Sequence, residues 1–147
     1  MRLIILAALT LALVSMPGVA SASLDSFLSN LNIQAQADLP GFSMKVGAQF
    51  GVPIPQVEAV IATVATPADA FMVFQLGQMA HRPPETVVQT YQTHKGKGWG
   101  VIAKQLGIKP GSKEFHALKN GDLVFNGVPA EGNGKGKGKR KGKGSNK

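Results

Sequence analysis

Prolines and glycines divide the middle of this sequence into short segments, and within each segment the apolar residues recur every three or four positions. This spacing gathers apolar side chains on one face of a helix, whereas a strand would alternate apolar and polar residues. The clearest segment begins at Pro55 and carries Val57, Val60, Ile61 and Val64 at the i, i+3, i+4 and i+7 positions. The sequence therefore predicts an all-α fold, a single small domain of several short helices.

Other segments of the same kind place further helices along the chain. We expect helices at residues 24–31, 40–50, 67–80 and 84–94, and a helical hairpin at residues 98–121. Residues 32–39 alternate as a strand would, but they can also continue the first helix. We prefer the helix because no second strand is visible to pair with them.

The segment 67–80 is the most apolar of these helices. Thr66 can cap its start, Pro67 fits the first helical position, and Asp69 can bond the exposed amides of the first turn. Large apolar residues surround much of the helix: Phe71, Met72, Phe74, Leu76 and Met79. Such a stripe can line a ligand pocket, but these residues are the ordinary filler of protein cores. We therefore expect this helix to be the most buried element.

The amino terminus has the three-part pattern of a secretory signal peptide. Arg2 supplies a positive charge, residues 3–16 are almost wholly apolar, and Ala20-Ser21-Ala22 fits an A-x-A cleavage site. We therefore predict a signal peptide at residues 1–22, a mature chain from Ser23, and a periplasmic or secreted protein with no transmembrane segment after cleavage. The sequence contains no cysteine, so an exported chain of this kind depends on its hydrophobic core for stability.

Positive charge is concentrated at the carboxy end of the chain. Residues 132–147 contain seven basic residues and neither acidic nor apolar ones, so they cannot bury surface and are predicted to be a disordered tail. The preceding residues, 23–131, carry eight basic and eight acidic residues and form the predicted helical domain. Lysines spaced by glycine can meet phosphates or carboxylates without recognising sequence. The predicted polyanion-binding residues are Lys135, Lys137, Lys139, Arg140, Lys141, Lys143 and Lys147.

The stretch GKGWGVIAKQLGIKPGS, residues 96–112, contains the glycine pattern of a dinucleotide-binding loop. Gly98, Gly100 and Ala103 occupy the positions G-x-G-x-x-A. That loop follows a strand within a βαβ unit, whereas here a helix is expected to precede it. The pattern therefore does not indicate a nucleotide site.

Residues 98–121 also match a helix-turn-helix, with Gly107 in the turn and a second helix from about Pro110. DNA-reading versions of this motif bury apolar residues at two positions of the second helix, and these positions hold Lys113 and His116. The mismatch, together with the predicted export, argues against gene regulation. A structural helical hairpin remains.

Trp99 lies between Gly98 and Gly100, where the backbone can turn sharply. It can be a core residue that fills the gap between two helices or a platform on which a ligand stacks, and we prefer the core residue. Lysines surround it in the sequence and form a possible secondary basic face: Lys95, Lys97, Lys104, Lys109, Lys113 and Lys119.

This part of the chain resembles a group of small exported bacterial proteins of uncharacterised function. The shared mark is GKGWGVIAKQLGIKPGSKEFHALK, preceded by PADAFMV and YQTHKGKG, and the resemblance covers most of residues 24–121. It implies an exported helical domain and brings no activity, cofactor or catalytic residue. The basic tail is not part of the resemblance.

Known catalytic patterns are missing from the sequence. It has no cysteine nucleophile and no G-x-S-x-G elbow. The carboxylates are scattered, and His81, His94 and His116 lack the spacing of metal ligands. We therefore expect no enzymatic activity, no metal site and no cofactor.

Two classes of function remain open. In the first, the protein is an exported, non-enzymatic binding module whose basic tail contacts polyanions without sequence specificity. Its partners would be nucleic acid, lipopolysaccharide, anionic lipid or acidic polysaccharide. In the alternative, it is a structural or protein-interaction domain of the cell envelope, and the tail only keeps it in solution.

Overall fold

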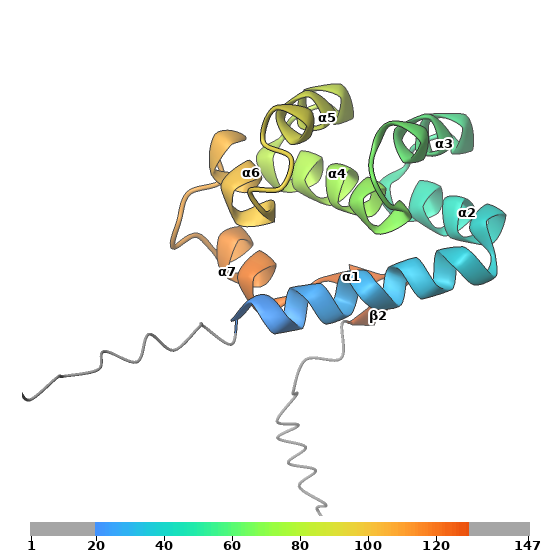
Figure 1. Cartoon of the computed structure of the whole chain (residues 1–147), viewed down its shortest axis with the longest axis horizontal. Coiled ribbons are helices and arrows are strands. Elements are labelled where there is room, and N and C mark those ends of the chain that lie inside the picture. The colour runs from blue at the N-terminus through green and yellow to red at the C-terminus, as the bar shows by residue number, and fades with distance from the viewer. Residues whose placement is uncertain (1–19, 130–147) are drawn as a thin grey trace, which may run out of the picture.

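The computed structural model describes residues 20–129, and within them the chain forms seven helices and one short antiparallel hairpin (Figure 1). The helices are α1 (Ala20–Ala37), α2 (Leu39–Phe50), α3 (Ile54–Thr63), α4 (Pro67–Ala80), α5 (Pro84–Thr93), α6 (Trp99–Gln105) and α7 (Lys113–Asn120). The hairpin consists of β1 (Val124–Phe125) and β2 (Val128–Pro129), with Phe125 paired to Val128. The predicted all-α fold is confirmed.

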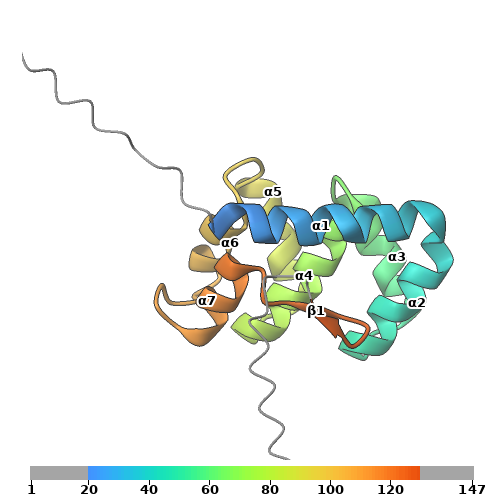
Figure 2. The same cartoon turned by 90° about the horizontal axis from the view of Figure 1, so that it is seen from below.

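Helix α4 lies at the centre of this arrangement. Helix α1 runs along one side of it, and α3 and α5 lie on the opposite side (Figures 1 and 2). Helices α6 and α7 close one end of the molecule, while α2 closes the other. Both α2 and α7 contact α1, which thereby connects the two ends.

Helix α4 is the most buried element, as its composition predicts. It packs against α1, α2, α3 and α5, so few of its side chains reach the solvent. Eight of its fourteen residues are buried: Ala68, Ala70, Phe71, Met72, Val73, Phe74, Leu76 and Gly77. Most of its large apolar side chains therefore belong to the core, and Phe74 also borders a pocket of about 360 Å³.

The helix starts follow the prolines. Pro40, Pro55, Pro67 and Pro84 each occupy one of the first two positions of a helix, where no backbone N–H is needed. At the start of α4 the predicted capping box is present. The Asp69 amide donates to the Thr66 hydroxyl at 3.2 Å, and the Thr66 amide donates to the Asp69 carboxylate at 3.2 Å.

Residues 32–37 continue α1, which confirms the preferred interpretation of that segment. Ala35 is buried, whereas Ile33 is 60% exposed, because the helical period carries these positions to different faces. The helix then ends at Asp38, whose carboxylate accepts from the Gly41 amide at 2.9 Å and caps α2. The alternation that suggested a strand is thus an accident of composition.

Helix α7 begins later than the sequence predicts. The predicted start is at about Pro110, but the first residue of the helix is Lys113. The reason is a cap: the Ser112 hydroxyl accepts from the Phe115 amide at 3.2 Å and fixes the start of the helix there. Gly111, with φ of 91°, makes the preceding turn.

The hairpin of β1 and β2 is an element that the helical pattern of the sequence did not predict. Its turn consists of Asn126 and Gly127, both with positive φ, which is the composition that two-residue hairpin turns require. The Asn-Gly pair between two short apolar runs was therefore a usable signal. Each strand is only two residues long, so no alternating pattern could develop.

Four helices end in the same way. After α2, α4, α6 and α7 the chain passes through one left-handed residue, and the next amide donates to the carbonyl five residues earlier, at 2.8 to 3.0 Å. The left-handed residues are Gly51, His81, Gly107 and Gly121. This is the glycine-favouring motif that satisfies the last carbonyls of a helix. Only His81 carries a side chain at this position.

Two predictions fall at the ends of the chain. The signal peptide at residues 1–22 lies almost wholly outside the described residues, and the basic tail at residues 132–147 lies entirely outside them. Among residues 20–129, no single helix is long and apolar enough to cross a membrane. Helices α3 and α4 pass that test together, but they are bent by 115° at their junction, and α4 is buried in the core.

The position of the last core residue predicts that the body folds without the tail. Phe125 is 4% exposed, and its ring lies 5.2 Å from Phe42 and 5.7 Å from Phe71. A chain of residues 23–131 should therefore keep the helical circular dichroism and the cooperative melting of a chain of residues 23–147. Phe125→Ala in the same chain is the control and should lose about 3–5 kcal/mol of stability, because the Phe125 ring is buried. Destabilisation by the Glu131 cut itself would show that the tail packs on the body.

His81 provides a second test of the backbone. Its φ of 52° places the β-carbon against the following carbonyl, so His81→Gly should raise the free energy of unfolding by about 1 kcal/mol. His81→Ala keeps the β-carbon and should give no such gain. Urea titrations of both variants measure the difference, and equal stability of the two would rule out backbone strain at this residue.

Candidate anion-binding pocket

Six lysines lie in and around helices α6 and α7. Residues 91–120 contain these six lysines and only one acidic residue, Glu114. All six are exposed: Lys95 and Lys97 before α6, Lys104 on α6, Lys109 between the helices, and Lys113 and Lys119 on α7. The secondary basic face predicted from the sequence is therefore accessible to solvent.

The structure brings three of these lysines to one hollow of about 500 Å³, which we call the lysine pocket. It lies between the start of α1 and the hairpin formed by α6 and α7. Among residues 20–129, no carboxylate lines it. The lining residues are Leu24, Lys97, Gly100, Val101, Lys104, Pro110, Phe115 and Lys119.

Helical spacing explains why these lysines meet. On α6, Ile102 and Ala103 turn toward the core, which leaves Val101 and Lys104 on the pocket side. On α7, Phe115 and Lys119 are four residues apart and share one face. Leu118, which is 1% exposed, holds that helix to the core.

Lys104 lies beside the aromatic ring of Phe115 in the lining of the pocket. Its Nζ lies 5.9 Å from the centre of the Phe115 ring, at the outer limit of a cation–π contact. The other predicted lysines, Lys95, Lys109 and Lys113, do not line the pocket. The sequence thus located the basic segment but not which of its lysines converge.

Trp99 packs against the core, as the preferred interpretation expects, but it is only partly buried. Its ring stacks on Tyr91 with centroids 5.4 Å apart and planes 25° apart. As the first residue of α6, Trp99 therefore joins that helix to α5 through one aromatic pair.

Tyr91 in turn ties α5 to the capping box of α4. Its hydroxyl donates to the Asp69 carboxylate at 3.0 Å and accepts from the Ala65 amide at 3.2 Å. Burial raises the pKa of Tyr91 above its ordinary value of 10.0, and the negative charge of Asp69 raises it further, while the Ala65 hydrogen bond acts in the opposite direction. A chain of contacts thus runs from the start of α4 to the start of α6.

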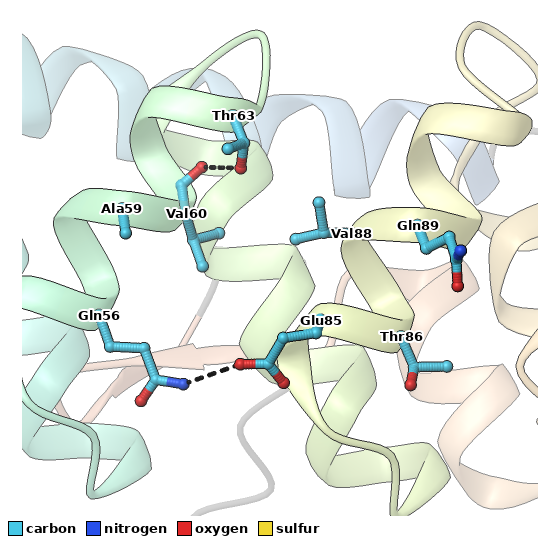
Figure 3. Close-up of a pocket in the computed structure, with 8 residues that line it drawn as sticks. All are labelled: Gln56, Ala59, Val60, Thr63, Glu85, Thr86, Val88 and Gln89. Atoms are coloured by element: carbon cyan, nitrogen blue, oxygen red, sulfur yellow. Dashed lines mark hydrogen bonds between the residues drawn. The ribbon is translucent and has the colours of Figure 1, made fainter.

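A second hollow, of about 520 Å³, lies between α3 and α5 (Figure 3). Gln56 and Glu85 reach toward each other across it, with the Gln56 amide donating to Glu85 Oε1 at 3.4 Å. Its lining is neutral apart from Glu85: Gln56, Ala59, Val60, Thr63, Thr86, Val88 and Gln89. This groove was not predicted from the sequence, because it depends on α5 lying beside α3.

The part of the chain that the structure describes holds no group of three histidine, cysteine or carboxylate side chains placed to bind a metal ion. His94 is part of a helix end, where its Nδ1 lies 3.0 Å from the Thr90 carbonyl oxygen. The lysine pocket therefore presents positive side chains beside apolar ones.

Comparison of this chain with protein-family models, with curated proteins and with solved structures finds no match. The resemblance to small exported bacterial proteins therefore stays a prediction.

The raised pKa of Tyr91 predicts a pH dependence of stability. In the unfolded chain a tyrosine loses its proton near pH 10, whereas folded Tyr91 keeps it to higher pH. Its contribution to stability is thus complete below pH 10 and is lost as the pH rises from 10 through the folded pKa. Tyr91 is the only tyrosine, so the ultraviolet absorbance of tyrosinate reports this one group.

The control for this titration is the same chain in concentrated urea, where the midpoint should return to about 10. Tyr91→Phe should remove this alkaline loss and lower stability at neutral pH by about 1–2 kcal/mol, because the Ala65 amide loses its acceptor. Identical titration of the folded and unfolded chains would contradict the assignment.

Proposed function

We propose that this protein is an exported, non-enzymatic binding module that contacts anionic polymers or surfaces electrostatically and without sequence specificity. The observation that carries the proposal is the convergence of Lys97, Lys104 and Lys119 on one pocket that no carboxylate lines. The seven basic residues between Lys135 and Lys147 extend the same chemistry beyond the described residues. Candidate partners are nucleic acid, lipopolysaccharide, anionic lipid and acidic polysaccharide.

The lack of sequence specificity is supported by the geometry of the helical hairpin. Lys113 and His116 are not buried, whereas a DNA-reading second helix would bury apolar residues at these positions. Phe115 and Leu118 hold α7 to the core instead. Lysine ammonium groups on long stems bind phosphate or carboxylate as point charges, which positions a polymer without reading it.

Export is proposed from the sequence of the amino terminus. Helix α1 begins at Ala20, so cleavage after Ala22 would remove only its first three residues and leave Leu24 at the pocket. Cleavage would also place a new amino-terminal positive charge one residue before Leu24. The mature protein would then present more positive charge at this end of the molecule.

The groove between α3 and α5 favours the second class of function. It is as large as the lysine pocket and contains no lysine, so it suits a neutral partner such as a protein segment. A structural or protein-interaction domain of the cell envelope, with the tail acting only as a solubilising extension, would use this groove. The two functions differ in their dependence on salt.

The proposal is tested by binding of the mature protein to heparin, to unrelated DNA duplexes and to anionic vesicles over a salt series. If all seven basic residues of the tail meet duplex phosphates, log K should fall against log salt with a slope of about −6. The slope should not change with DNA sequence. A mature chain ending at Glu131 should lose most of this slope and keep the share that comes from the body.

Two triple variants apportion the share of the body. Replacement of Lys97, Lys104 and Lys119 by glutamine should reduce the slope by about one for each phosphate that the variant no longer neutralises. The same change at Lys95, Lys109 and Lys113 removes equal charge outside the pocket and is the matched control. Absence of binding by every chain at low salt would leave the envelope-domain function as the better account.

A further inference from the structure

The lysine pocket has a feature that electrostatic binding of a polymer does not need. Its floor is apolar and is formed by Leu24, Val101 and Phe115 from three different helices. Leu24 and Val101 are only partly buried, so apolar surface is left in contact with water. Exposed charge on this segment does not require such a hollow, because three of its exposed lysines lie outside the pocket: Lys95, Lys109 and Lys113.

Three lysines belong to the same lining, and we call them the charged rim. Because none of the described residues that line the pocket is acidic, the pocket favours a bound anion. The Lys104 ammonium lies over the edge of the floor, 5.9 Å from the Phe115 ring centre. An anionic head bound there would hold any chain attached to it against the apolar side chains.

From this combination we infer that the lysine pocket binds single molecules of an anionic amphiphile, with a carboxylate or phosphate head on Lys97, Lys104 and Lys119 and an alkyl chain over Leu24, Val101 and Phe115. The inference rests on the proposed anion binding and adds the class of ligand. A hollow of about 500 Å³ falls within the usual range of small-molecule sites. Contact with the floor removes apolar surface from water, which a polysaccharide or a phosphate backbone would not do.

The probes are free hexanoate, octanoate and decanoate, each below its micelle concentration, titrated calorimetrically into the full mature chain. Affinity should rise about fourfold for each methylene that reaches the floor. Octanol has the chain without the charge, and acetate has the charge without the chain. Both should bind at least about tenfold more weakly than octanoate.

Variants separate the rim from the floor. The triple glutamine variant of Lys97, Lys104 and Lys119 should weaken octanoate binding about tenfold or more, whereas the matched variant of Lys95, Lys109 and Lys113 should not. Val101→Thr keeps the shape of the side chain but makes it polar, so the gain per methylene should shrink while acetate binding stays unchanged. Circular dichroism of each variant shows that its fold is intact.

Three results would overturn the inference. They are affinity that does not depend on chain length, equal loss in the two triple variants, or binding to phosphatidylglycerol vesicles with none to free octanoate. Binding to heparin and DNA is measured separately from these three results. The ligand class can therefore fail while the proposed function stands. If heparin and DNA binding were absent while octanoate still bound, the proposed polymer binding would fail and the ligand class inferred for the lysine pocket would stand.

Discussion

Phe71 is the side chain on which the packing of this molecule depends. From the middle of α4 its ring meets Phe27 of α1 at 5.5 Å, Phe50 of α2 at 5.5 Å and Phe125 of the hairpin at 5.7 Å, each nearly edge to face. These partners come from the beginning, the middle and the end of the described chain. The core therefore joins all of these segments, and we expect them to unfold together as one unit.

The lysine pocket is a consequence of that closure. Helix α1 contacts α7 at one end of the molecule. This contact brings Leu24 beside the helical hairpin of α6 and α7, which lies more than seventy residues further along the chain. Ile102, Leu106 and Leu118 fill the inner side of the hairpin, so its lysines must lie on the outer side. The buried side chains of α6 and α7 thus determine where their lysines lie, and the docking of α1 completes the pocket.

The sequence predicted the fold well because its helix starts are chemically explicit. Prolines mark four of the starts, and the start of α4 also has the capping box of Thr66 and Asp69. The β-hairpin at Val124 was missed because two-residue strands leave no period. The sequence also did not show that Trp99, which packs against the core, would stack on Tyr91 and stay partly exposed. The pocket could not be predicted, since it joins residues from three helices and its apolar floor shows only after α1 has docked.

Gln49 of α2 holds the β-hairpin by hydrogen bonds, in addition to the contact between the Phe42 and Phe125 rings. The Gln49 amide donates to the Val124 carbonyl at 2.8 Å and accepts from the Asn126 amide at 2.8 Å, as a third strand would. The end of the described chain, at Pro129, is therefore held at a defined place on the body. In the sequence, the seven basic residues begin only six positions later, at Lys135. Under the proposed function, an anionic surface that binds the body would lie close to those residues, so two weak contacts would act with the avidity of one strong contact.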